Sequence, residues 1–161
     1  MNKKKYHICL GLGTNQGNKE ENLKRAIELL SLALGKYIAL SSFIETEPWG
    51  FESKNSFLNC VVIFTASLSP MELLETTENI EKKLGRTTKS SNGVYHDRLI
   101  DIDILLYEDK IVSNDRLTIP HPLIQERDFV LTPLCEIAPQ RIHPILGKSF
   151  AEIKADKEKK R

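Results

Sequence analysis

The sequence predicts an α+β domain in which helices pack on an antiparallel sheet. Short segments rich in β-branched residues and alternating in polarity predict strands, whereas two longer segments carry apolar residues at helical spacing. The elements follow in the order strand, helix, strand, strand, helix, strand, and a hairpin and short helices complete the chain. The 161 residues suit a single domain over 1–161, in which residues from about 155 to 161 form a charged tail.

The first strand is predicted over 6–12 and the first helix over 18–35. Asn18 is a suitable N-cap, Glu21 completes a capping-box-like pair with it, and Gly35 ends the helix. The apolar face of this helix consists of Leu23, Ala26, Ile27, Leu30 and Leu34. The glycines in 11–17 lack the spacing of a dinucleotide-binding fingerprint, so we interpret them as a structural turn between the strand and the helix.

Two more strands are predicted over 37–45 and 57–67, followed by a second helix. Ser69, Pro70 and Glu72 form a helix start with a capping box, and Gly85 ends the helix. The residues at its helical spacing are Met71, Leu74, Thr77, Ile80, Glu81 and Leu84.

The loop over 46–56 is long enough to suggest a function. It contains Trp49 and Phe51, which either suit a flat ligand or fold back on the core. The strand that follows the second helix completes the βαββαβ order of a ferredoxin-like fold.

That strand, predicted over 98–107, places two carboxylates in an apolar segment. Asp101 and Asp103 alternate with isoleucines, so their side chains share one face of the strand. Their Cβ atoms are expected about 7 Å apart, which allows the carboxylates to bridge a common cation or a pair of cations. One solvated strand face is the simpler interpretation, but aspartate is depleted in strands. We predict a hard-cation site, most simply Mg²⁺ holding a phosphate substrate.

Basic residues surround this strand. Arg86 and Arg98 bracket a polar loop that we interpret as a mobile lid, and arginine can match phosphate oxygens with two parallel hydrogen bonds. His121 lies between two prolines, where the backbone is stiff. The segment 108–112 predicts a turn and a hairpin, 130–138 predicts a short apolar helix, and the remainder is expected to be irregular.

Composition narrows the class of protein further. The formal net charge is +1, so no overall field points to nucleic acid or a membrane, and we expect neither as a partner. The three cysteines, Cys9, Cys60 and Cys135, lie in apolar contexts without metal-site spacing, which indicates reduced thiols. We therefore expect a cytoplasmic protein, which we take to be a monomer.

Taken together, these motifs resemble the 6-hydroxymethyl-7,8-dihydropterin pyrophosphokinase family of folate biosynthesis. The resemblance covers nearly the whole chain and rests on Gly11-Leu-Gly-Thr-Asn15, Thr46-Glu-Pro-Trp-Gly50, Phe57-Leu-Asn59, Gly85-Arg86, Arg98-Leu-Ile-Asp-Ile-Asp103, Ile119-Pro-His121, Arg127-Asp-Phe129 and Pro133-Leu-Cys-Glu-Ile-Ala-Pro139. It implies transfer of pyrophosphate from ATP to the hydroxymethyl group of the pterin, which gives AMP and the pterin diphosphate.

The resemblance also implies roles for individual residues. Two Mg²⁺ ions would be held by Asp101 and Asp103, which with Arg86 and Arg98 form the catalytic set. The ATP-binding positions match Glu81, Arg86, Arg98, Ile104, His121 and Arg127. The pterin-binding positions match Thr46, Glu47, Trp49, Phe57, Asn59 and Phe129, of which the two phenylalanines would sandwich the ring.

The chain departs from the family pattern just before the aspartates. Tyr95-His96-Asp97-Arg98 stands where members commonly carry Trp-Gly-Pro-Arg, and Thr88 replaces a second lid arginine. Lys89 or His96 are candidates to replace the missing charge. A non-enzymatic ferredoxin-like ligand-binding module is the alternative function, against which the aspartate pair argues because such a module does not need it.

Overall fold

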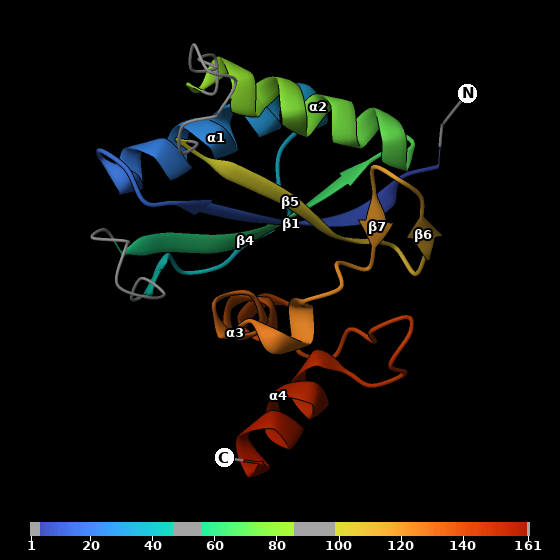
Figure 1. Cartoon of the computed structure of the whole chain (residues 1–161). Helices are drawn as coiled ribbons and strands as arrows, with labels where there is room; N and C mark the ends of the chain where they lie inside the picture. Colours follow the sequence, from blue (N-terminus) through green and yellow to red (C-terminus); the bar gives the residue numbers. More distant parts are fainter. Residues whose placement is uncertain (1–3, 47–55, 86–98, 161) are drawn as a thin grey trace.

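The computed structural model describes residues 4–46, 56–85 and 99–160. Figure 1 shows an antiparallel sheet with helices α1 and α2 on one face and α3, with α4 beyond it, on the other. The strands run in the order β2, β4, β1, β5, and β3 also pairs with β4. The strands are β1 (Tyr6–Thr14), β2 (Ala39–Leu40), β3 (Ile44–Thr46), β4 (Phe57–Ala66), β5 (Asp101–Tyr107), β6 (Val112–Ser113) and β7 (Thr118–Ile119). The helices are α1 (Lys19–Leu34), α2 (Pro70–Lys83), α3 (Asp128–Ile137) and α4 (Phe150–Lys159), with a 3₁₀ turn over Ile124–Glu126.

The predicted α+β class and the two long helices are confirmed. The Asn18 side chain accepts the Glu21 N–H and caps α1, and all five residues of the predicted apolar face of α1 are buried. Ser69 and Glu72 form the full capping box of α2. The face of α2 is rotated slightly from the prediction, because Leu73 is fully buried whereas Met71 and Leu74 are half-buried.

The predicted strand over 37–45 is wrong, because the structure has two short strands there, β2 and β3. Ser41 lies between them, and its Oγ accepts the N–H of Val61 at 2.9 Å in place of a backbone carbonyl. The next residue, Ser42, donates its N–H to the carboxylate of Glu136 on α3 at 3.0 Å. Side chains therefore satisfy the backbone at this break and tie it to α3.

The interpretation of Gly11 and Gly13 as a turn is also wrong. Both lie within β1, which continues to Thr14, and Gly11 pairs with Asp103 while Gly13 pairs with Asp101. The turn into α1 follows at 16–18. The glycines therefore keep one face of β1 free of side chains next to the aspartates.

Each face of the sheet has its own apolar layer. Residues of α1 and α2 pack on the face that carries Ile8, Leu10, Val62 and Phe64. Residues of α3 and α4 pack on the opposite face, around Cys9, Val61, Ile63 and Leu106. Within the described ranges, no helix combines the length and apolar character that crossing a membrane requires.

The C-terminal region is more regular than the sequence suggested. The predicted helix over 130–138 is confirmed as α3, but the segment expected to be irregular and to end in a solvated tail forms α4. Ser149 and Glu152 make a capping box, and Phe150 and Ile153 are buried against α3.

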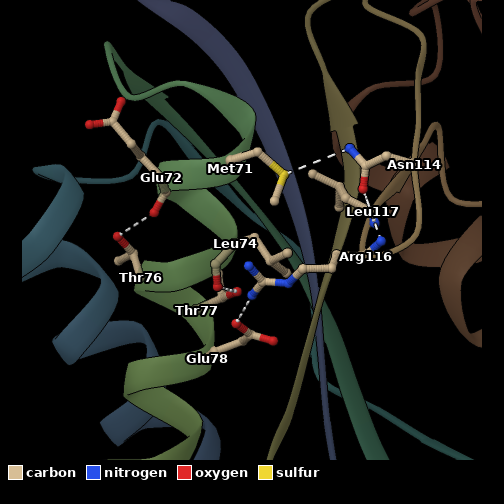
Figure 2. Close-up of polar contacts among 9 residues, drawn as sticks. All are labelled: Met71, Glu72, Leu74, Thr76, Thr77, Glu78, Asn114, Arg116 and Leu117. Atoms are coloured by element: carbon tan, nitrogen blue, oxygen red, sulfur yellow. Dashed lines mark hydrogen bonds and ion pairs between the residues drawn. The ribbon is translucent and has the colours of Figure 1, made fainter.

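The turn predicted after Tyr107 is present, but the hairpin lies further along the chain than predicted. Val112–Ser113 pairs with Thr118–Ile119 as β6 and β7, and the connection between these two strands docks on α2. In Figure 2, the Nδ2 of Asn114 lies 3.8 Å from the Sδ of Met71, and Arg116 forms an ion pair with Glu78 at 2.8 Å. The Oδ1 of Asn114 also accepts the N–H groups of Arg116 and Leu117, which shapes the connection. The segment after β5 is thereby held at the edge of the domain, and it leads from there to His121.

Candidate functional site

The site is built on the sheet face that α3 covers in part. Asp101 and Asp103 lie on this face, opposite Gly13 and Gly11 of β1, and both carboxylate residues are half-buried. Asn59 of β4 pairs with Gly13 from the other side. A row across three strands is therefore formed by Asn59, Gly13 and Asp101. Two strand spacings place the Cα atoms of Asn59 and Asp101 about 10 Å apart. The predicted shared face of the two aspartates is confirmed.

Gly13 is needed because the side chain of Asn59 leans over it. A Cβ at position 13 would lie 2.6 Å from the Oδ1 of Asn59, which is closer than real Cβ contacts. Asn59 is 5% exposed, and its Nδ2 donates to the Oγ1 of Thr46 at 3.2 Å. The hydrogen bond to Thr46 of β3 thus holds the amide of Asn59 in one orientation, and the absence of a side chain at Gly13 leaves room for it.

The strand that carries the aspartates is anchored at its edge. Thr14 donates its hydroxyl to the carbonyl of Leu99, and the Oε2 of Glu81 accepts the N–H of Ile102 at 2.9 Å. Glu81 is 5% exposed and comes from α2, on the opposite side of the sheet from Asp103. The geometry therefore gives Glu81 a role in fixing β5.

We expect Glu81→Ala to lower the free energy of unfolding by about 2 kcal/mol, because the buried N–H of Ile102 loses its acceptor. Glu78→Ala is the matched control, since its ion pair with Arg116 is partly exposed and is worth less than about 1 kcal/mol. Urea denaturation measures both values. Equal losses in the two variants would contradict a specific role for Glu81.

His121 and Arg127 come from the segment before α3, and His121 lies close enough to both Asp103 and Arg127 to feel their charges. The N–H of His121 donates to the carbonyl of Leu105, and its Nδ1 accepts the N–H of Leu123 at 3.2 Å. Burial lowers the pKa of His121, the nearby positive charge of Arg127 lowers that pKa further, and the negative charge of Asp103 acts against both. The imidazole is therefore neutral near pH 7, and its Nε2 is left to donate because Nδ1 is an acceptor.

His121 and a second histidine should make stability depend on pH. The Nδ1 of His143 accepts the N–H groups of Ile145 and Leu146 at 3.1 Å, and burial lowers the pKa of His143. When the folded pKa is lowered, the unfolded chain binds the proton first, so stability is full above the unfolded pKa of about 6.5. Stability then falls as the pH drops through that value toward the folded pKa.

We expect urea midpoints that are constant between about pH 7 and 8 and decrease from about pH 6.5 to 5. The decrease in unfolding free energy is at most about 1.4 kcal/mol per pH unit for each histidine. His143→Gln should make the decrease shallower, because glutamine has no proton to gain in this range. An equally steep decrease in this variant would show that His143 is not responsible.

The remaining predicted residues fall into three groups. Phe57 lies on the same sheet face as Asn59. Phe129 lies at the start of α3, and the centroid of its ring is 5.6 Å from the Cζ of Arg127. Ile104 is 5% exposed, with its side chain in the layer under α1 and α2, on the other face from Asp103. The predicted residues Glu47, Trp49, Arg86 and Arg98, and the lid over 86–98, lie outside the described residues.

The carboxylate pair suits a cation whose remaining ligands come from a substrate. In the ranges that the structure describes, no third His, Cys, Asp or Glu joins Asp101 and Asp103 in a metal-binding group. Mg²⁺ is commonly bound by one or two carboxylates together with substrate phosphates and water, so two hard oxygen donors on an accessible face fit it.

Comparison with known proteins shows that this α+β domain is of the phosphotransferase class. A family model described as 7,8-dihydro-6-hydroxymethylpterin-pyrophosphokinase (HPPK) matches residues 9–139. The chain belongs to this pyrophosphokinase family, and membership disfavours a non-enzymatic binding module.

Individual relatives are named as pyrophosphokinases as well. A 2-amino-4-hydroxy-6-hydroxymethyldihydropteridine pyrophosphokinase from Porphyromonas gingivalis is 49% identical over 138 residues, covering 85% of this chain and 93% of the relative. One with the same name from Aquifex aeolicus is 41% identical over 149 residues, covering 92% and 91%. The crystal structure of wild-type Plasmodium falciparum HPPK-DHPS matches with a TM-score of 0.77 at 18% identity, over 97% of this chain and 45% of that longer chain. This last match shows the fold alone.

Proposed function

We propose that this protein transfers pyrophosphate from ATP to the hydroxymethyl group of 6-hydroxymethyl-7,8-dihydropterin, giving AMP and the pterin diphosphate. The observation that carries the proposal is the row of Asn59, Gly13 and Asp101 on one sheet face, which sets a polar amide two strands away from a carboxylate on the same face. Family membership and the names of the relatives support the same reaction.

Asp101 and Asp103 would hold two Mg²⁺ ions, which when bound supply positive charge at the phosphate oxygens. The two carboxylates sit on a sheet strand that Glu81 fixes from behind, so their separation is set by the backbone. Such rigidity matters because diphosphate transfer depends mainly on positioning and charge.

The nucleotide would lie between the aspartates and the segment with His121 and Arg127. The neutral imidazole of His121 offers an Nε2 donor, and Arg127 offers a permanent charge with several donors. Arg86 and Arg98 are proposed to complete the phosphate contacts. These groups bind and orient the triphosphate for attack by the pterin hydroxyl on its β-phosphorus.

The pterin would lie at the other end of the row. Asn59 has an amide that can accept and donate at the edge of the ring, and Thr46 fixes its orientation. Phe57 and Phe129 would stack on the two ring faces, where aromatic contacts add area and geometry. Glu47 and Trp49 are proposed as further contacts.

An assay with ATP, the hydroxymethyl-dihydropterin and Mg²⁺ tests the function. We expect AMP to form only when all three are present. Release of ADP, or AMP formation without the pterin, would overturn the proposed reaction. A cytoplasmic monomer is proposed with it, and the three free cysteines support a reducing compartment.

A further inference from the structure

Helix α4 lies beyond the residues 9–139 that match the family model, yet it contacts the segment that carries Arg127. The Nζ of Lys157 donates to the carbonyl oxygen of Glu126 at 2.9 Å and forms an ion pair with the Oδ1 of Asp128 at 2.8 Å. These two partners are the residues directly before and after Arg127. Lys157 therefore contacts the backbone before the arginine and the side chain of the residue after it.

The segment around Arg127 has no side-chain cap of its own. Arg127 is the N-cap residue of α3, with an extended backbone at φ −107° and ψ 107°, and its side chain makes no capping hydrogen bond. It joins the 3₁₀ turn to α3, so its conformation sets where its side chain points. Its guanidinium lies over Phe129, which couples the two side chains.

Lys157 comes from a well-anchored helix. Phe150 and Ile153 are buried against α3, and the Ser149 capping box fixes the start of α4. The side chain of Lys157 is 26% exposed, so the contact is partly shielded from solvent. A rigid helix can thus hold the peptide before Arg127 in one place.

We propose that Lys157 is a positioning residue that orients Arg127 and Phe129 for substrate binding. The roles of Arg127 and Phe129 rest on the proposed function, whereas the contacts of Lys157 with Glu126 and Asp128 do not. Lys157 itself does not touch the substrate in this proposal; it acts through the carbonyl of Glu126 and the carboxylate of Asp128.

Lys157→Met keeps the aliphatic stem and removes both polar contacts. Lys154→Met is the matched control, because Lys154 is on the same helix and pairs with Glu158 within it. Lys157→Arg should restore the wild-type values. Three measurements are made on the full chain: amide hydrogen exchange over 124–131, binding of α,β-methylene-ATP with Mg²⁺ by calorimetry, and steady-state turnover.

We expect Lys157→Met to speed exchange in 124–131 and to weaken binding of the analogue about fivefold, with a smaller effect at high salt. In turnover, KM for ATP should rise with kcat nearly unchanged, because the variant loses positioning of a binding group. Lys154→Met should match the wild type in all three measurements.

The proposal is overturned if exchange over 124–131 is the same in the two methionine variants, or if Lys157→Met binds the analogue as tightly as Lys154→Met does. Failure of the proposed function looks different. In that case the wild type makes no AMP from ATP and the pterin, while the exchange difference between the two variants persists.

Discussion

Asp103→Asn should lower kcat for AMP formation by at least about 10²-fold while the fold is retained. Asparagine has the shape of aspartate but not its charge, so the proposed site would lose an anionic ligand for the cations that would neutralise the triphosphate. Loss of outer-shell support alone typically costs a metal site 10- to 100-fold, which sets about 10² as a lower bound for a direct ligand. Steady-state kinetics at several Mg²⁺ concentrations measures the effect, and excess Mg²⁺ should restore part of the activity.

Asp109→Asn provides the matched control. Asp109 is exposed in the turn after β5, so the same change of charge occurs near the other end of the same strand. This variant should keep wild-type kcat and the wild-type response to Mg²⁺. If Asp103→Asn keeps kcat within about twofold of the control, the assignment of Asp103 as a cation ligand is wrong.

Gly13→Ala should raise KM for the pterin about tenfold and leave KM for ATP unchanged. The added Cβ would lie 2.6 Å from the Oδ1 of Asn59, so the amide must turn away from its present position. Leaving a buried polar group without its hydrogen-bond partner costs about 1–3 kcal/mol. A loss of about 1.4 kcal/mol of binding free energy corresponds to a tenfold weaker affinity. Steady-state kinetics with each substrate varied in turn measures the effect.

A double-mutant cycle separates this explanation from general damage to β1. Asn59→Ala should raise KM for the pterin in the wild-type background, but Gly13→Ala should add little once Asn59 is absent. Gly11→Ala serves as a control in the same strand, because its Cβ would first meet the flexible side chain of Leu105 at 3.3 Å. Additive effects of Gly13→Ala and Asn59→Ala would show that the glycine acts on something other than this amide.

The residues of the proposed site come from distant stretches of the chain. Asn59 is on β4, the aspartates are on β5, and Arg127 and Phe129 lie at the start of α3. A single sheet face collects the strand residues because pairing brings alternate positions of neighbouring strands together. Helix α3 adds the last two by packing on that same face.

Much of this was determined locally by the sequence. The ends of α1 and α2 followed from Asn18, Gly35 and Ser69, because caps involve residues a few positions apart. The shared face of Asp101 and Asp103 followed from the two-residue period of a strand. Features that depend on residues only a few positions apart can be predicted from the sequence in this way.

Some of the local signals were nevertheless missed. The pair Ser149 and Glu152 is a capping box that predicts the start of α4, whereas the charge of the last residues favours an irregular, solvated tail. Cys9, Gly11 and Gly13 alternate as one strand face, which would have extended β1 beyond Leu12. Both signals are visible in the sequence, but the charged C-terminal residues also fit a solvated tail and the glycines also fit a turn.

Other features were decided by the tertiary structure alone. The break between β2 and β3 depends on the bond from Ser42 to Glu136, which is 94 residues away. The need for glycine at position 13 depends on Asn59, and the lowered pKa of His121 depends on its burial. The sequence by itself determined which residues face the same way along one element, because that is a matter of local backbone geometry. Which elements meet, and therefore what each side chain contacts, was decided only when the sheet and its two helical layers packed.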